Sequence, residues 1–279
     1  MKLQLGYEFF YSFPQPTPCL LILNVHHTRA SDLTGPDHIL TSPATRLDGY
    51  RDLFGNWCNR LVAPAGSFRV YANAAIYDSG QPDPVALGAR ESPVENLPDE
   101  ALTFLIPSRF CESDKLLDMS WELFGNTPPG WERVQAICDF VHNRITFSYE
   151  NARPTRTAAE AYQESIGVCR DYAHLAIAFC RALNIPARYC TGYLSDLGTP
   201  LPYPDGDFAA WFEAYLDGEW QVFDPRNNQP RLGRVLIARG RDAADVAMVT
   251  TFGPNTLERF HVWTDEITEP PLAHPLPQL

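Results

Sequence analysis

The sequence predicts an α+β protein in which a β-sandwich-like N-terminal domain precedes a domain of helices followed by an antiparallel sheet. Segments rich in β-branched and aromatic residues dominate the first hundred residues, whereas helical patterns begin only after Arg109. After Pro186 the pattern returns to strands. Helices that precede a run of strands are typical of the α+β class, in which the helices cover one face of the sheet.

Length and composition favour two domains without a nucleic-acid or membrane surface. The 279 residues exceed the usual size of one domain, and 45% of them are hydrophobic, which is enough for a sizeable core. The net charge is -12 and the pI is near 5.0, and no basic run interrupts this acidic balance. The first residues lack the apolar core of a signal peptide, and no apolar run approaches the roughly 18 residues that a membrane span needs. We therefore expect a soluble cytoplasmic protein.

The cysteine and histidine patterns predict neither a disulfide framework nor a metal site. The seven cysteines are odd in number and contain no C-x-x-C pair, so reduced thiols are expected. His26 and His27 are adjacent at a strand end, where neighbouring side chains point to opposite faces and cannot share a metal. We interpret them as strand-end or surface residues, and we expect no metal and no cofactor.

The first domain is expected to cover residues 1–95. Its strand signals fall at residues 3–13, 19–26 and 67–77, which are separated by clusters of Pro, Gly, Asp and Asn. From Ser79 to Glu100 the composition changes to Pro, Gly, Asp and Glu with few large apolar residues, which indicates a linker.

The second domain, residues 96–268, is expected to begin with helices. Ser113 is a candidate cap for a helix over residues 114–124, and apolar residues recur at helical spacing over residues 131–145. Thr157 and Glu160 have the spacing of a capping box at the start of a shorter helix.

The rest of this domain shows strand patterns, and Asp217-Gly218 is a strong signal for a two-residue hairpin turn. The expected strands lie at residues 187–194, 208–216, 219–223, 234–237, 246–252 and 259–263. The proline-rich residues 269–279 are expected to form an extended or disordered tail.

Cys169 opens the apolar run that predicts the central helix of the second domain. A thiol in the first turn feels the positive end of the helix dipole and unpaired backbone N–H groups, which lower its pKa and suit it to act as a nucleophile. A small buried residue at a helix start is an equally good interpretation of this position alone, because free cysteines are often buried.

Several motifs in order resemble the bacterial transglutaminase-like superfamily, and the likeness extends over the whole chain. They are Gly-Val-Cys-Arg-Asp-Tyr-Ala-His-Leu at residues 167–175, Asp-Phe-Ala-Ala-Trp-Phe-Glu-Ala-Tyr-Leu at residues 207–216, and Trp-Gln-Val-Phe-Asp-Pro at residues 220–225. The resemblance implies a papain-like fold in which a helix N-terminal cysteine faces a sheet that carries a histidine and then an aspartate. It assigns Cys169 as the nucleophile and Asp224 as the group that orients the base.

The sequence departs from the family pattern at the base. The family's Asp-Phe-His-Ala-Trp reads here as Asp207-Phe-Ala-Ala-Trp, so Ala209 stands where the resemblance implies the catalytic histidine. Trp211 shares a strand face with Ala209 and is expected to form a wall of the cleft. Asp171 and Tyr172, which follow Cys169 in its motif, are the other candidate binding residues. Glu213 is either a weak substitute base or an ordinary strand carboxylate.

Three other histidines are alternatives for the missing base. His174 lies five residues after Cys169 and, at about 100° per residue, points toward the core side of the helix, so we interpret it mainly as a hydrogen-bonded packing residue. His142 is expected to face solvent on the preceding amphipathic helix. His261, in a predicted strand, remains an outside candidate. With Ala209 in place, Asp224 is expected to bind water, a backbone N–H or a nearby side chain, because a buried lone carboxylate is costly.

Two functions follow from the resemblance, and whether the chain is an enzyme stays open at this point. The first is a cysteine acyl-transfer enzyme, an amide hydrolase, protease or transglutaminase, that attacks a peptide or another amide through a thiolate and a thioester. Its activity would be absent or impaired for want of the histidine. The alternative is a non-catalytic descendant of the same fold that binds a peptide or protein in the cleft. A metal-binding function is poorly supported, because no Cys or His pair has ligand spacing.

Overall fold

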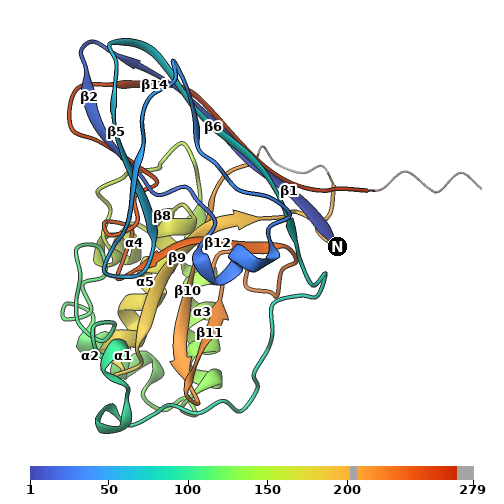
Figure 1. Cartoon of the computed structure of the whole chain (residues 1–279). Coiled ribbons are helices and arrows are strands. Elements are labelled where there is room, and N and C mark those ends of the chain that lie inside the picture. Colours follow the sequence, from blue (N-terminus) through green and yellow to red (C-terminus); the bar gives the residue numbers. More distant parts are fainter. Residues whose placement is uncertain (202–205, 269–279) are drawn as a thin grey trace, which may run out of the picture.

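The computed structural model describes residues 1–201 and 206–268 (Figure 1). Its helices are α1 (Asp99–Leu102), α2 (Leu117–Phe124), α3 (Trp131–Arg144), α4 (Ala158–Glu164) and α5 (Cys169–Ala182), with 3-10 turns η1 (His27–Asp32) and η2 (Val94–Asn96). Its strands are β1 (Lys2–Phe13), β2 (Thr17–Leu21), β3 (Leu40–Ser42), β4 (Asp48–Arg51), β5 (Trp57–Ala63), β6 (Gly66–Tyr77), β7 (Thr146–Phe147), β8 (Ile166–Gly167), β9 (Ala187–Leu194), β10 (Ala209–Leu216), β11 (Glu219–Phe223), β12 (Arg234–Gly240), β13 (Val249–Thr251) and β14 (Thr256–Glu266).

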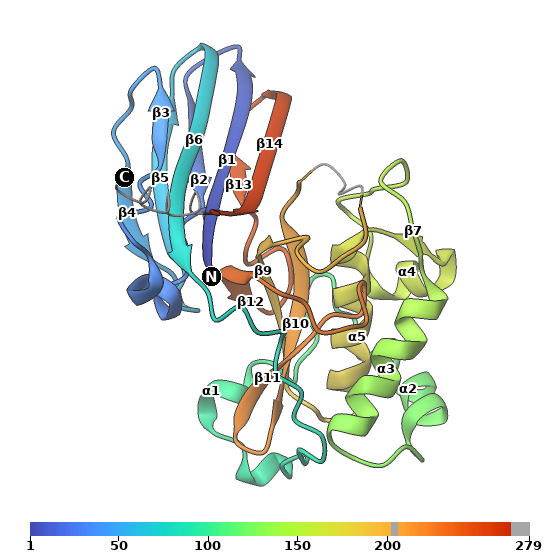
Figure 2. The same cartoon turned by 90° about the vertical axis from the view of Figure 1, so that its right-hand side faces the viewer.

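Two four-stranded antiparallel sheets form the β-rich unit (Figure 2). Their strand orders are β14-β1-β6-β3 and β13-β2-β5-β4. Along β1 every second residue is a buried apolar side chain, as the twofold period of a strand that covers a core requires. The buried positions of β1 include Leu3, Leu5, Tyr7, Phe9, Tyr11 and Phe13. The β-sandwich-like first region predicted from the sequence is confirmed.

Two strands from the end of the chain complete these sheets. β14 pairs with β1 over almost its whole length, and β13 pairs with β2. The sequence places residues 246–268 in the second unit because strand signals do not reveal their partners. Strand pairing instead puts residues 249–266 in the β-rich unit, so the chain enters the second unit and returns. The expected tail from residue 269 lies outside the described residues.

The second unit is an antiparallel sheet with strand order β11-β10-β9-β12 and helices against one face (Figures 1 and 2). α5 packs on β9 and β10, and α3 and α4 pack on α5. From Asp171 to Ala182 every residue of α5 is buried, which explains the long apolar run in the sequence. Asp217 and Gly218 both have positive φ, 48° and 84°, as the predicted two-residue hairpin turn demands.

The helix boundaries follow local capping chemistry. At the start of α4 the Thr157 and Glu160 side chains form the predicted capping box. α2, by contrast, begins at Leu117 and not at residue 114, because a hydrogen-bonded turn over Glu112 to Leu116 precedes it. Ser113 therefore does not cap this helix.

The β-rich unit is joined to the second unit through β12, the edge strand of the second sheet. The backbone N–H of His26 donates to the carbonyl of Leu236 at 2.9 Å, and the Asn56 side chain both accepts from and donates to the Arg239 backbone. These bonds cover an edge that would otherwise expose unpaired backbone groups. His26 is fully buried at this junction and caps the 3-10 turn η1, so its expected position at a strand end or at the surface is wrong.

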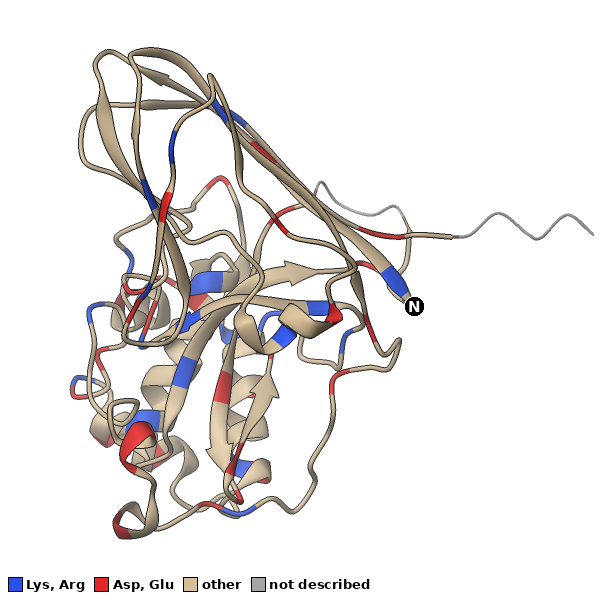
Figure 3. Ribbon diagram, in the orientation of Figure 1, with Lys and Arg blue, Asp and Glu red and all other residues tan. Residues whose placement is uncertain are grey.

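Charged residues are interspersed along the ribbon in the view of Figure 3, and many arginines pair with carboxylates. Two carboxylates fix the predicted linker to the second unit. Asp83 pairs with Arg234 at 2.8 Å, and Glu91 pairs with Arg133 at 3.0 Å. Within the described part of the chain, no helix is long and apolar enough to cross a membrane.

Candidate active site

Cys169 is the first residue of α5, and a neighbouring carboxylate defines this helix start. The Asp171 side chain accepts the backbone N–H of Val168 at 2.9 Å and pairs with Arg156 and Arg170 at 3.1 and 3.2 Å. Cys169 itself is half-buried, whereas the other six cysteines are buried and none of the seven forms a disulfide. Cys169 is therefore the thiol that a reagent or substrate reaches most readily.

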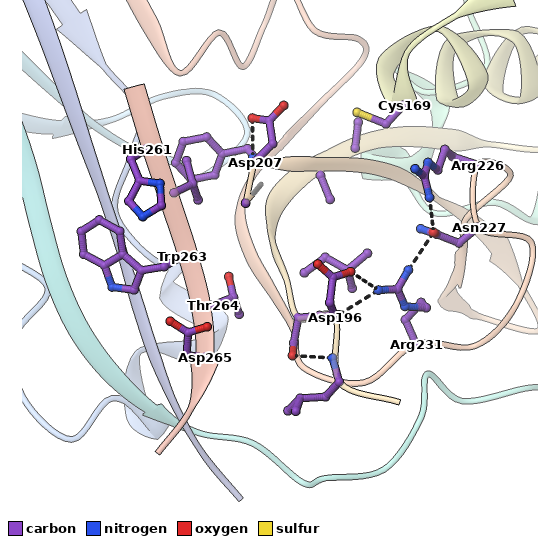
Figure 4. A pocket seen from close by; sticks show the side chains of 18 of the residues that line it. Cys169, Asp196, Asp207, Arg226, Asn227, Arg231, His261, Trp263, Thr264 and Asp265 are labelled. Atoms are coloured by element: carbon purple, nitrogen blue, oxygen red, sulfur yellow. Dashed lines mark hydrogen bonds and ion pairs between the residues drawn. The ribbon is translucent and has the colours of Figure 1, made fainter. Parts of the chain in front are cut away.

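Cys169 and Ala209 line the same cavity, which has a volume of about 490 Å³ (Figure 4). One wall comes from the second unit and the opposite wall from β14 of the β-rich unit. The side chains of the first wall include Phe147, Tyr149, Asp207, Arg226, Asn227 and Arg231, and those of the β14 wall include His261, Trp263, Thr264 and Asp265. The expected meeting of the helix-start sulfur with the strand that carries position 209 is thus present.

Burial and, to a smaller extent, the charge of Asp207 raise the pKa of the Cys169 thiol to about 12. Backbone hydrogen bonds at Ala210 and Arg170 lower this pKa but do not offset the burial. The expectation that the helix start lowers the thiol pKa is therefore wrong. The helix dipole is weaker than the loss of hydration, and no histidine cation lies at position 209 to compensate. At neutral pH the thiol stays protonated.

Asp224 is buried, and both oxygens of its carboxylate have partners. Its carboxylate accepts from the backbone N–H and the side-chain Nδ2 of Asn227 at 3.0 and 2.8 Å, and it pairs with Arg234 at 2.9 Å. Arg234 also pairs with Asp83, so one guanidinium balances two carboxylates. The prediction that Asp224 binds a backbone N–H or a nearby side chain in place of imidazole is confirmed.

The three candidate binding residues have structural contacts. Trp211 is 1% exposed, lies beneath Arg234 at 4.7 Å from guanidinium carbon to ring centre, and is absent from the cavity lining. It shares the face of Ala209 but is covered by Arg234, so it does not wall the cleft. Asp171 fixes the start of α5, as described above, and the buried Tyr172 donates from its hydroxyl to the Ile145 carbonyl at 2.5 Å.

The three histidines considered as replacements for the base occupy different positions, and of these three only His261 lines the cavity. His174 is fully buried, its Nε2 accepts the Ala243 backbone N–H at 3.1 Å, and burial lowers its pKa well below the usual value, which confirms a packing role. His142 does not face solvent as expected, because its Nδ1 lies 3.1 Å from the carbonyl oxygens of both Pro225 and Arg226. His261 lines the cavity on the β14 wall, across from the wall of Cys169.

Glu213 is an ordinary strand carboxylate. It pairs with Arg188 at 2.6 Å and does not line the cavity. No group of three or more His, Cys, Asp and Glu side chains in residues 1–201 and 206–268 is arranged to hold a metal ion.

Sequence reasoning missed the polar groups that share the cavity with Cys169. Asp207 accepts from the backbone N–H of Phe208 at 2.7 Å and from the Tyr149 hydroxyl at 3.3 Å, and burial raises its pKa. Arg226 stacks over the ring of Phe147 at 4.5 Å. Asp207 begins one of the motifs noted above and Arg226 directly follows another, but sequence spacing does not show which side chains turn toward one cavity.

Comparison with known proteins gives the family. The Transglutaminase-like superfamily model matches residues 120–225, the segment from α2 to just after Asp224. An uncharacterized protein of Mycobacterium leprae is 34% identical over 217 residues, which are 76% of this chain and 77% of that protein. An uncharacterized protein of Mycobacterium tuberculosis is 38% identical over 127 residues, 40% of each chain.

A solved structure extends the likeness to the complete arrangement of both units. The crystal structure of a candidate cysteine protease from Cytophaga hutchinsonii is 31% identical, covers 97% of this chain and 93% of its own, and has a TM-score of 0.81. The likeness therefore includes the β-rich unit as well as the helices and sheet around Cys169. The chain belongs to the transglutaminase-like superfamily.

Proposed function

We propose that the chain is a transglutaminase-like cysteine acyl-transfer enzyme, of the amide hydrolase, protease or transglutaminase type, whose activity is impaired because Ala209 replaces the base. Its substrate class is a peptide or another amide. The observation that supports this proposal most is that Cys169, alone among the cysteines in being partly exposed, opens into the cavity that position 209 also lines. The free state of all seven cysteines also fits the reducing cytoplasm.

In this proposal the Cys169 sulfur attacks the carbonyl carbon of an amide, and the amide nitrogen leaves with a proton. A thioester forms and is then resolved by water or by an amine. The first step needs a group that takes the thiol proton and later gives one to the leaving nitrogen. The thiol pKa is about 12 and position 209 offers only a methyl group, so position 209 does not supply that group.

The experiment is to restore the imidazole with Ala209→His and to measure hydrolysis of amide, ester and glutamine substrates. A positioned general base contributes about 10² to 10⁴-fold in rate, so a gain in this range is expected. The matched control is Ala209→His combined with Cys169→Ala, which should abolish the gain. No gain in the single variant, or an equal gain in the double variant, would contradict the assignment of Cys169 and position 209.

The second candidate is a non-catalytic protein that binds a peptide or protein in the cleft, and two observations favour it. The thiol is held protonated, and both oxygens of Asp224 already accept from Asn227 or Arg234. On this alternative Ala209→His folds normally, gains no hydrolysis, and leaves the binding of any peptide ligand unchanged.

A further inference from the structure

Arg226 is placed in the cavity by contacts on both its backbone and its side chain. Its own carbonyl and that of Pro225 accept from His142 on α3, which fixes the turn after Asp224. Its guanidinium lies over the ring of Phe147, and the ring centres of Tyr149 and Tyr172 are 4.9 and 6.5 Å from that of Phe147. The guanidinium is therefore held in position before any ligand arrives.

Arg226 and Arg231 both line the cavity but differ in their pairing with carboxylates. Arg231 pairs with Asp196 at 3.0 Å and donates to the Asn227 side chain at 2.7 Å. Arg226 donates to the same Asn227 oxygen at 2.8 Å, but within the described ranges, which leave out residues 202–205, it pairs with no carboxylate. A guanidinium has five N–H donors in a fork that fits a carboxylate, so most of its donors remain available here.

Arg226 lines the same cavity as the Cys169 thiol. Both residues line the cavity on the wall of the second unit, together with Asp207 and Tyr149. An anion that pairs with Arg226 therefore lies in the cavity into which Cys169 opens. Among residues 1–201 and 206–268 Arg226 has no carboxylate partner, and such a guanidinium in the cavity of a chain with net charge -12 is suited to recognise an anionic ligand.

We infer that Arg226 binds a carboxylate of the substrate, so that the amide presented to Cys169 belongs to a compound that carries a carboxylate close to that amide. The inference rests on the proposed function because it treats the ligand as a substrate. The binding of an anion beside the thiol does not depend on that function. Anion binding can be measured without any acyl transfer. A negative result for anion binding is therefore distinguishable from failure of the proposed function.

The test compares alkylation of Cys169 by iodoacetate, an anion, and by iodoacetamide, its neutral analogue. In both reactions the thiolate sulfur displaces iodide and forms a sulfur–carbon bond, while the thiol proton goes to solvent. The ratio of the two rates, taken at one pH, does not depend on the fraction of thiolate. Because the other six cysteines are buried, the label reports on Cys169, and the Cys169→Ser variant verifies this.

We expect Arg226→Gln to lower the iodoacetate-to-iodoacetamide ratio about three- to tenfold, the effect of removing one nearby charge in a partly shielded cavity. Arg226→Lys should keep most of the ratio. Asp207→Asn, which removes a negative charge from the same cavity, should raise it. Arg90→Gln, which removes an exposed arginine paired with Asp217 outside the cavity, should leave it unchanged. A ratio in Arg226→Gln equal to that in Arg90→Gln would overturn the inference.

The source of the carboxylate is tested by protection of Cys169 from iodoacetamide. N-acetylalanine offers a terminal carboxylate, N-acetylglutamic acid α-amide offers only a side-chain carboxylate, and N-acetylalaninamide offers none. Protection by one of the two acids identifies the source and should be lost in Arg226→Gln. Equal protection by the neutral amide, or no protection by either acid at concentrations up to solubility, would contradict carboxylate binding.

Discussion

Two carboxylates from the family-like motifs, Asp224 and Asp207, have opposite surroundings. Asp224 is buried and receives two hydrogen bonds from Asn227 and an ion pair from Arg234. Asp207 lines the open cavity, receives hydrogen bonds from the Phe208 backbone and Tyr149, and has no ion pair among residues 1–201 and 206–268. The first is a structural group and the second is available to a ligand.

The difference explains how the fold persists without the imidazole. A carboxylate that orients a histidine would be left unpaired and buried when the histidine is lost, at a high cost in stability. Here Arg234 balances that carboxylate and covers Trp211 on the same face as Ala209. The side of the site behind position 209 is therefore closed and satisfied, whereas the side that holds Cys169, Asp207 and Arg226 is open.

The closed side should be the one on which stability depends. Arg234→Met keeps the length of the side chain but leaves Asp83 and Asp224 without their shared counter-ion. Breaking a buried ion pair in this way costs about 3 to 5 kcal/mol in free energy of unfolding. Urea denaturation followed by circular dichroism measures this loss.

Two matched variants show whether the loss comes from the buried charges. Arg90→Gln breaks an exposed pair, with Arg90 83% exposed, and should cost no more than about 1 kcal/mol. Arg234→Met with Asp224→Asn should be more stable than Arg234→Met alone, because one of the two stranded charges is gone. A loss in Arg234→Met as small as that in Arg90→Gln would contradict the structural role of this network.

The open side should tolerate the loss of its carboxylate. Burial raises the pKa of Asp207, so the folded protein holds this proton at pH values at which the unfolded chain has already lost it. Ionisation of Asp207 therefore lowers stability as the pH rises through the usual aspartate range, and the penalty persists at pH 7. Asp207→Asn removes this penalty and keeps an oxygen for the Phe208 N–H, while its Nδ2 can donate to the Tyr149 hydroxyl.

We expect Asp207→Asn to leave the free energy of unfolding at pH 7 unchanged or to raise it by about 0.5 kcal/mol, with the gain gone near pH 3. Urea titrations at the two pH values make the comparison. A loss greater than about 1 kcal/mol at pH 7 would show that Asp207 is structural and would remove the contrast with Asp224.

Local chemistry made much of this fold predictable from the sequence. The Thr157 capping box, the Asp217-Gly218 turn and the strand at residues 187–194 depend on neighbouring residues, and the structure confirms each of them. The pairing of β14 with β1 depends on contacts between residues more than two hundred positions apart. Hydrophobic patterns mark such strands but do not name their partners.

The same distinction holds at the site. The order of the motifs predicts that Cys169 and position 209 lie at one site, which the structure bears out. The cost of burying a lone carboxylate predicts that Asp224 has a partner. The thiol pKa was misjudged because the helix dipole can be inferred from position, whereas the extent of burial cannot. Arg226 and Asp207 were missed because their orientation toward one cavity depends on Phe147, Tyr149 and His142, which come from other segments.

The most direct test of the site is the pH dependence of Cys169 alkylation by iodoacetamide in the unaltered protein and in Ala209→His. With a thiol pKa of about 12, the rate in the unaltered protein should rise about tenfold per pH unit from pH 8 to 11 without a plateau. An imidazole at position 209 should form an ion pair with the thiolate and bring the plateau toward neutral pH, whereas Thr264→His, on the opposite wall of the same cavity, should not. A profile in Ala209→His that is the same as in the unaltered protein would show that position 209 does not face the sulfur.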